Sequence, residues 1–347
     1  MHTHANKRAR SRTSKSSRRH RAARWARVAV VAAAPVLGAG AVASPALAQG
    51  GNHYRFTTLN NQGDPTFNQL LGINQHGLIA GYLGSGQPGH ANKGYLLSAP
   101  YGQANYRNEN WPESSQTQVT GLNDKGVTVG FWSSTNNAAV GNNPPVNDNR
   151  AFVSVHGYFI DGDVPIDVKT AAVPPVDQLL GVNDHNVAVG FYNDAAGNTH
   201  AYTFDIRHNQ FNEITPSGIT NPTAAAINNR GNIAGFGTTG GQTVGYLLHR
   251  DGQVTVLSVT GARMTQALGI NDDNEIVGVY TDAGGVLHGF TWTPERGFRT
   301  VDDPNASQTS GNGTTINGVN DEGQLVGFYT DNAGNTDGLL ATPHHHR

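Results

Sequence analysis

Short apolar runs bounded by Gly, Asn or Asp recur along the chain from residue 49 onward. Apolar and polar residues alternate in many of them, as in HAYTF from His200 and VTVL from Val254. Alternation with a period of two is typical of β-strands, whereas no window beyond residue 48 shows the 3.6-residue period of an amphipathic helix. The pattern therefore predicts an all-β protein of many short strands joined by tight turns.

The predicted strands belong to a repeat that occurs six times. Its central phrase reads LLGINQHGLIAGY in the first copy and VTGLNDKGVTVGF in the second. The shared Asn is found at Asn74, Asn123, Asn183, Asn228, Asn271 and Asn320. The intervals are 49, 60, 45, 43 and 49 residues, and a period of this size suits a propeller blade of four antiparallel strands. We therefore expect a six-bladed β-propeller.

Two positions of the repeat predict local backbone geometry. Three residues after the shared Asn, only Gly or Asn is found. Both tolerate the left-handed αL conformation, so this position predicts a hairpin turn. A further Gly stands seven residues after the Asn in every copy, beginning with Gly81. A Gly that recurs inside a strand indicates a bulge or a close backbone contact.

The two ends of the repeat region complement each other. The sixth copy stops at GLLATP, one strand short, and YRFTTLN from Tyr54 precedes the first copy without a blade of its own. We predict that this N-terminal strand completes the last blade, because circular closure removes exposed sheet edges. A linear β-solenoid is the alternative, but it would need a cap at each end. The predicted domain spans 49–342, with a tail at 343–347.

The first 48 residues differ from the rest in charge. They hold ten of the 23 Lys and Arg residues and none of the 25 Asp and Glu residues, which leaves the remainder with 13 basic and 25 acidic side chains, a net charge of −12. A basic stretch at 7–27, an apolar run at 28–43 and the sequence Ala46-Leu47-Ala48 predict a signal peptide over 1–48. We therefore expect a secreted protein, free or associated with the cell surface, without a membrane span after cleavage.

Composition disfavours two classes of function. The acidic body lacks the clustered Lys and Arg that nucleic acid binding needs. The chain has no Cys, which excludes disulfides, thiolate catalysis and Cys-based metal sites. The fold must therefore be held together by its own hydrophobic core.

The repeated phrase, followed by His-[Ala/Gly]-[Phe/Tyr], resembles the HAF-type extracellular repeat family of bacterial exported proteins. The tripeptide is clearest at 200–202 and 288–290, and the segment at 150–152 is close to it. The resemblance covers nearly all of the chain after the signal segment. It implies an exported bacterial repeat protein and supplies no catalytic signature to transfer.

A polar residue recurs five positions before the shared Asn, on the strand that a propeller places nearest its axis. The six residues are Gln69, Gln118, Gln178, Thr223, Gln266 and Thr315. A ring of amides and hydroxyls around the axial channel is a candidate site for water, a sugar or a weakly bound cation. The structural alternative is that these side chains pair with one another and with channel water.

No metal or other cofactor is expected, with calcium as the minor alternative. The first residue of the HAF-like tripeptide varies between copies as Lys93, Arg150, His200, Val244, His288 and Asp337. This mixed set predicts a solvated strand start and no shared metal. The densest carboxylate clusters are Asp272 and Asp273 near Glu275, and Asp302 with Asp303. Neither matches a known calcium loop, and hairpin turns favour Asp without an ion.

The second candidate site lies in the irregular blades 1 and 2. YRNENW from Tyr106 is a weak fourth strand, and blade 2 has an insertion at 133–149 that we expect to be an exposed loop. Trp111 and Trp132 belong to these blades, where they either stack on a sugar ring or lie partly buried.

No recognisable catalytic signature is present, since the chain contains neither G-x-S-x-G nor H-E-x-x-H. We therefore expect a secreted binding or scaffold module for an extracellular glycan, small molecule or protein. A secreted hydrolase or lyase acting on glycans or lactones is one alternative, and a structural cell-surface or matrix protein is the other.

Overall fold

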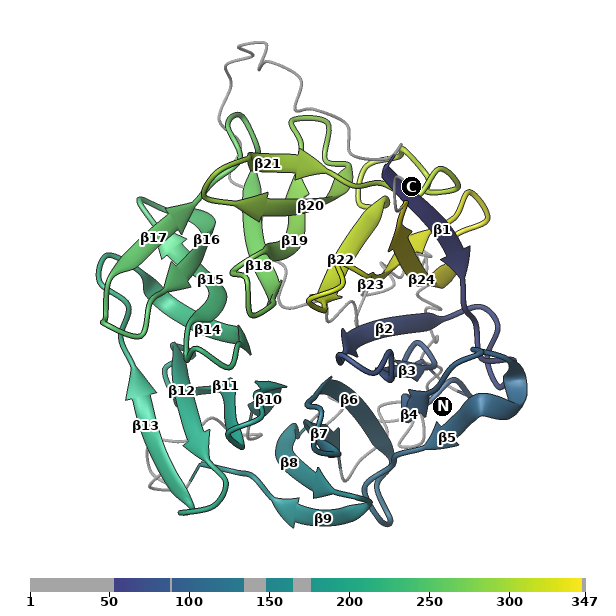
Figure 1. Ribbon diagram of the computed structural model, residues 1–347, viewed down its shortest axis with the longest axis horizontal. Coiled ribbons are helices and arrows are strands. Elements are labelled where there is room, and N and C mark those ends of the chain that lie inside the picture. Colours follow the sequence, from purple (N-terminus) through teal and green to yellow (C-terminus); the bar gives the residue numbers. More distant parts are fainter. Residues whose placement is uncertain (1–52, 88, 134–147, 165–175, 345–347) are drawn as a thin grey trace, which may run out of the picture. The chain divides into compact units, whose positions relative to one another are not determined.

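The computed structural model describes residues 53–87, 89–133, 148–164 and 176–344. In this part of the chain, 24 strands form six four-stranded antiparallel sheets arranged around a common axis (Figure 1). The protein is therefore a six-bladed β-propeller, which confirms the fold predicted from the repeat. The predicted signal segment at 1–48 and most of the insertion at 133–149 lie outside the described residues.

Each of the first three blades runs in chain order from an innermost strand to an outermost strand (Figure 1). Blade 1 consists of β2 (Asn68–Ile73), β3 (Ile79–Leu83), β4 (Lys93–Leu97) and β5 (Tyr106–Asn108), with a 3₁₀ turn η2 (Gln103–Asn105) before β5. Blade 2 consists of β6 (Gln116–Leu122), β7 (Val127–Ser133), β8 (Arg150–Val155) and β9 (Tyr158–Asp161). Blade 3 consists of β10 (Asp177–Val182), β11 (Val187–Asn193), β12 (Thr199–Asp205) and β13 (Gln210–Ile214).

Blades 4 and 5 repeat this order, and blade 6 differs in the origin of its outer strand. Blade 4 consists of β14 (Thr220–Ile227), β15 (Ile233–Thr239), β16 (Gln242–Leu248) and β17 (Val254–Leu257). Blade 5 consists of β18 (Met264–Ile270), β19 (Ile276–Thr281), β20 (Leu287–Thr293) and β21 (Gly297–Thr300). Blade 6 consists of β22 (Thr314–Val319), β23 (Leu325–Thr330), β24 (Thr336–Pro343) and, from the other end of the chain, β1 (Tyr54–Thr58).

Strand β1 closes the ring. It pairs antiparallel with β24, with Tyr54 opposite Pro343 and Thr58 opposite Leu339. Leu59, which follows β1, is buried in the hydrophobic cluster between blades 6 and 1. The predicted circular closure is therefore confirmed, and β24 ends one residue beyond the predicted domain boundary at 342.

The repeated turn has the predicted geometry. All six residues three positions after the shared Asn have positive φ, between 61° at Asn186 and 82° at Gly231. The Gly seven residues after the Asn is required by a close backbone contact, because a Cβ at Gly278 would lie 1.9 Å from the carbonyl oxygen of Gln266. The innermost strands also contain the expected bulge, for instance between Leu70 and Gly72.

Apolar side chains fill the interfaces between blades. In the interface between blades 5 and 6, Val301, Leu325 and Ala341 are all fully buried within one cluster. Burial of this kind, about 25 cal/mol per Å² of apolar surface, is the main stabilising contribution in a chain without disulfides. Among the residues described, we find no helix with the length and apolar character needed to cross a membrane.

Candidate functional site

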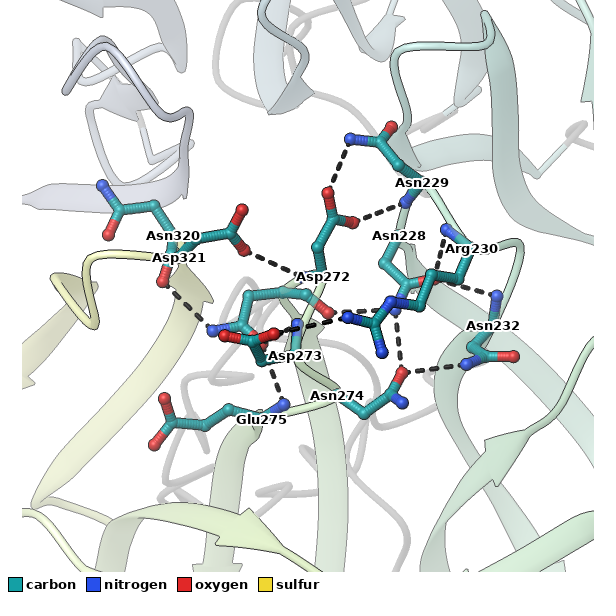
Figure 2. A network of polar contacts seen from close by, with 11 residues as sticks. Asn228, Asn229, Arg230, Asn232, Asp272, Asp273, Asn274, Glu275, Asn320 and Asp321 are labelled. Carbon is teal, nitrogen blue, oxygen red and sulfur yellow. Dashed lines mark hydrogen bonds and ion pairs between the residues drawn. The ribbon is translucent and has the colours of Figure 1, made fainter.

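The shared Asn residues form a closed ring of hydrogen bonds around the axis, which we call the inner belt. Each Asn donates its Nδ2 to the backbone oxygen of the corresponding Asn in the next blade, at 2.9–3.2 Å, and Asn320 returns the ring to Asn74. The Oδ1 of Asn228 meanwhile accepts from the backbone N–H of Arg230 and of Asn232 (Figure 2). The shared Asn therefore builds its own turn and links neighbouring blades.

A second ring, the outer belt, is formed by the residue after each shared Asn. In each blade its backbone N–H donates to the side-chain oxygen of the equivalent residue in the next blade, at 2.7–2.9 Å. Figure 2 shows this contact between Asn229 and Asp272. The six residues are Gln75, Asp124, Asp184, Asn229, Asp272 and Asp321. Four of them are Asp, so the end of the axial channel at the outer belt is rich in hydrogen-bond acceptors.

The two belts line a small polar funnel of about 80 Å³ on the axis. Burial and the neighbouring Asp272 and Asp273 carboxylates raise the pKa of Asp321, the outer-belt residue of blade 6. The outer belt has a signal in the sequence, because each copy of the repeat has Asp, Asn or Gln directly after the shared Asn. All three types present a side-chain oxygen.

The predicted channel ring does not line this funnel. Its six side chains lie on the innermost strands but are only 0–7% exposed: Gln69, Gln118, Gln178, Thr223, Gln266 and Thr315. The reason is that side chains of the innermost strand point to the two faces of the blade, where other strands cover them, and the funnel is lined by Ile73 and Asn74 at the far end of that strand. Gln69 Oε1 accepts from the Tyr82 hydroxyl at 2.8 Å, and Gln118 Nε2 donates to Asn92. The six side chains therefore do not form the open ring around the axial channel that we expected. Their role in ligand binding stays a prediction.

The predicted solvated strand start is also corrected, because three of the basic residues there, Arg150, His200 and His288, are held between carboxylates. His288 contacts Asp302 at 2.7 Å and Asp282 at 3.5 Å, and it stacks on Tyr280. The hydrogen bond that His288 donates to the Asp302 carboxylate raises the pKa of His288 despite burial. His200 is held in the same way by Glu213 and Asp194 over Tyr192. The carboxylates come from loops and outer strands, which the tripeptide pattern alone does not reveal.

The two tryptophans of the second candidate site stack on each other. The ring centroids of Trp111 and Trp132 are 4.9 Å apart at an interplanar angle of 3°. Both are half-buried, and the Arg150 guanidinium lies 6.0 Å from the Trp132 ring. One face of each indole is therefore occupied by the other, and binding of a sugar by this pair stays a prediction.

The carboxylates named as calcium alternatives have protein partners. Asp272 accepts from Asn229, Asp302 pairs with His288, and Asp303 accepts from the Asn305 backbone. In the described ranges, no group of three or more His, Asp or Glu side chains is arranged to hold a metal ion. These clusters lend calcium no support.

A larger cavity, of about 290 Å³, lies between blades 1 and 2. We call it the interblade cavity. Leu78, Leu96 and Val127 give it apolar walls, and Arg107 and His156 lie at its exposed end. It is next to the turn that follows Asn123, whereas Trp132 is near the other end of strand β7. Neither Trp111 nor Trp132 therefore lines this cavity.

Glu109 is the buried polar centre of the interblade cavity. Its side chain is 5% exposed, and its Oε1 accepts from the Ser154 hydroxyl at 2.7 Å and the Thr128 hydroxyl at 3.1 Å. Both hydroxyl residues belong to blade 2 and are buried. The three side chains form one polar network across the interface, which we call the polar trio.

The polar trio occupies positions that hold apolar residues or Gly in the other five interfaces. The equivalents of Glu109 follow the outer strand of each blade, and those of Thr128 and Ser154 face each other on the second and third strands of the next blade. In chain order around the ring the equivalents are Gly162, Ala188 and Phe204; Ile214, Ile233 and Leu248; Leu257, Ile276 and Trp292; Val301, Leu325 and Ala341; and Leu59, Ile79 and Leu97. Only the interface between blades 1 and 2 has a charged residue and two hydroxyls here.

Sequence reasoning missed this site because its members are far apart in the chain. The one local signal is Thr128, which replaces an apolar residue five positions after the shared Asn. Ser154 lies on the third strand of blade 2 and Glu109 directly follows the fourth strand of blade 1, where the repeat is too loose to align without the sheet register.

Comparison with known proteins identifies similar folds but no family. No protein-family model and no curated protein matches the chain. Among solved structures, it is similar to TolB from Acinetobacter baumannii, with 14% identity, a TM-score of 0.50, and coverage of 81% of this chain and 66% of that one. It is also similar to virginiamycin B lyase from Staphylococcus aureus (10% identity, TM-score 0.42, 85% and 90% covered) and to the Aleuria aurantia lectin AAL (9%, 0.45, 80% and 96%).

These similarities bear on architecture alone. The chain spans 66% of the length of TolB, and the identity of 14% supports a shared propeller fold and nothing further. The lyase and the lectin are more distant in structure and contribute no functional argument. The chain is thus a six-bladed propeller, and its resemblance to the HAF-type repeat family stays a prediction.

Proposed function

We propose that the protein is an exported binding module that holds a small organic molecule in the interblade cavity. The observation that carries this proposal is the polar trio, found at one of six equivalent interfaces and adjoining a cavity of about 290 Å³. Ligand sites in proteins combine apolar walls with a few convergent polar groups. The interblade cavity has this combination, with leucine and valine walls around one buried carboxylate.

The energetic cost of burying the polar trio supports a functional origin for it. Replacing a buried apolar contact by a charged residue removes hydrophobic stabilisation and adds a desolvation cost of several kcal/mol per ion. The equivalent positions of the other five interfaces, which hold apolar residues or Gly, show that the repeat can be completed there without this cost. Departures from local folding rules in otherwise consistent proteins concentrate at functional sites.

The alternative of a hydrolase fits this cavity less well. Glycoside hydrolysis uses two carboxyl groups on either side of the scissile bond. Glu109 is the only carboxylate among the described residues that line the interblade cavity. A binding role requires only one such group, so we prefer it to the hydrolase or lyase hypothesis and to a purely structural role.

Export is part of the proposal and rests on the sequence. The basic stretch, the apolar run and the Ala46-Leu47-Ala48 sequence support cleavage before Gln49. Mass spectrometry of the protein recovered from the medium of an expressing bacterium is expected to give Gln49 as the first residue. Recovery of uncleaved protein in the cytosol would contradict export and leave the cavity argument untouched.

The cavity is tested by ligand-observed NMR with a library of amine, alcohol, amide and acid fragments. Leu78→Trp places an indole at a half-buried wall of the cavity, and Val187→Trp makes the same change at the equivalent position of blade 3. We expect a set of fragments to bind the wild type and Val187→Trp and to be lost from Leu78→Trp. In the wild type, the amide signals of Thr128 and His156 are expected to shift, which does not depend on any variant folding. Fragments that bind all three proteins alike, or that shift neither signal, would refute the proposal.

A further inference from the structure

The carboxyl group of Glu109 is only half satisfied by the protein. Both hydroxyl donors, from Thr128 and Ser154, act on Oε1. No hydrogen bond to Oε2 comes from the described residues, and Oε2 is not among their fully buried unpartnered atoms. Because Glu109 lines the interblade cavity, Oε2 is the atom that a ligand in this cavity meets.

No positive charge of the described protein neutralises this carboxylate. The ion pairs found in the described ranges involve His90, Arg150, His200, His208, Arg230 and His288, and none includes Glu109. Arg107 lines the cavity but is exposed and makes no ion pair with Glu109. A carboxylate that is 5% exposed needs a paired charge or further hydrogen bonds, because desolvation of an unpaired ion is unfavourable.

We infer that the ligand carries a protonated amine and that Glu109 binds it through Oε2. This inference rests on the proposed function and names the ligand class for the same cavity. An ammonium group supplies both the missing charge and hydrogen-bond donors, and charge-assisted hydrogen bonds are about twice as strong as neutral ones. Thr128 and Ser154 then act as positioning residues, since they hold the carboxylate without touching the ligand's nitrogen.

The walls define the remainder of the ligand. Leu78, Leu96 and Val127 surround the carboxylate with apolar surface, so a compact hydrocarbon body next to the amine gains hydrophobic burial. A bare metal ion fits poorly, because a single carboxylate does not supply the six to eight oxygen ligands of calcium or the three protein ligands of a zinc site. The inferred class is therefore a small amine with an apolar body.

Three probes with one carbon skeleton test the inference: benzylamine, benzyl alcohol and benzoate. Affinities are measured by NMR titration at millimolar concentration for the wild type, Glu109→Gln and Glu113→Gln. Glu113 is an exposed acid four residues further on that does not line the cavity, so it controls for the change in net charge. Glu109→Asp keeps the charge and tests for partial rescue.

We expect benzylamine to bind the wild type at least about tenfold more tightly than benzyl alcohol or benzoate. Glu109→Gln should abolish this preference, Glu113→Gln should keep it, and Glu109→Asp should retain part of it. The inference is overturned if benzylamine fails to bind the wild type, or if its advantage survives in Glu109→Gln.

The two proposals fail in different ways. If benzyl alcohol binds the cavity as well as benzylamine, and Leu78→Trp removes both, the cavity is a ligand site but the amine inference is wrong. If none of the binding responds to Leu78→Trp, the proposed function itself is wrong.

Discussion

The interface between blades 5 and 6 and the interface between blades 1 and 2 are built from the same repeat but filled differently. Val301, Leu325 and Ala341 are fully buried in the first. The equivalent residues in the second are Glu109, Thr128 and Ser154, which are also buried but are joined by hydrogen bonds. Backbone pairing is alike in the two places, with Thr128 opposite Ser154 and Leu325 opposite Ala341.

The difference teaches that the repeat determines where a residue lies and leaves its chemistry free. A buried position in a propeller interface accepts a carboxylate when the facing strands supply donors and a cavity adjoins it. Without those donors, the same carboxylate has no partner. Substitutions that exchange the two interfaces therefore separate the stability of the fold from the function of the site.

The largest effect is expected from Val301→Glu, which places the acid in an interface without donors. Leu325 and Ala341 cannot hydrogen-bond to it, so the free energy of unfolding should fall by about 4 kcal/mol or more. Urea denaturation monitored by tryptophan fluorescence measures this loss. Val301→Gln, of similar size but uncharged, is the control and should lose clearly less. Equal losses would mean that volume, and not charge, decides what these interfaces accept.

The next effect concerns the interface between blades 2 and 3, which holds a buried acid of its own. Asp177 accepts from the Tyr202 hydroxyl and the Val164 backbone, both at 2.6 Å, and burial raises its pKa to about 7. The carboxylates of Asp163 and Asp161 add to this increase. Since the pKa in the folded state exceeds the ordinary value of 3.8, the unfolded chain releases this proton first.

Stability from Asp177 is therefore present below about pH 4 and is lost as the pH rises through 7. Between pH 5 and pH 8 the free energy of unfolding should decrease by about 2–3 kcal/mol from this group. His200 and His288, whose pKa values are also raised, change stability in the same direction. Urea denaturation of Asp177→Thr across this range isolates the contribution, because Thr is the equivalent residue in three blades. The free energy of unfolding of Asp177→Thr should change less with pH than that of Asp251→Thr, the control at an exposed acid. If both variants show the same pH dependence, the effect does not come from Asp177.

The third effect is a gain in stability. The triple variant Glu109→Val, Thr128→Leu and Ser154→Ala gives blades 1 and 2 the residues of blades 5 and 6. Replacing a buried polar network by apolar residues is commonly neutral or stabilising by 1–4 kcal/mol, so we expect a gain of about 2 kcal/mol. Thermal unfolding monitored by circular dichroism tests this, and fragment binding in the cavity should be lost. A variant that is less stable than the wild type would assign the trio to structure.

The features that the sequence predicted correctly are those that depend on backbone geometry repeated in every blade. The αL position, the close Gly contact and circular closure each follow from local rules, and six copies make the signal strong. The repeat predicts the turn that follows the shared Asn, but it does not predict the role of that Asn in the inner belt. That role links Asn320 to Asn74, residues 246 positions apart, and becomes visible only once the ring is closed.

The features that sequence reasoning missed depend on side-chain direction and on strand register. Gln69 and its equivalents point to the covered faces of their blades, and the funnel is lined by residues at the far end of the same strands. The polar trio joins residues 19 and 45 positions apart across two blades, and the loosely repeated outer strands give no alignment for Glu109. Single departures from a repeat are therefore informative only after the register assigns them to one interface.

The smallest expected effect tests whether the polar trio acts as a unit. Thr128→Val alone removes one of two donors to a buried carboxylate and should cost about 1–2 kcal/mol. In a Glu109→Leu background the same change removes a hydroxyl that no longer has its acceptor, so it should be neutral or slightly stabilising. The coupling energy from this double-mutant cycle, measured by urea denaturation, is expected to be about 1 kcal/mol or more. The cycle of Leu325→Val with Val301→Leu, at the equivalent apolar pair, is the matched comparison and should show little coupling of electrostatic origin. If the two cycles give the same coupling energy, the hydroxyl of Thr128 stabilises Glu109 no more than an apolar contact stabilises Val301. The polar trio would then not act as a unit that positions the Glu109 carboxylate.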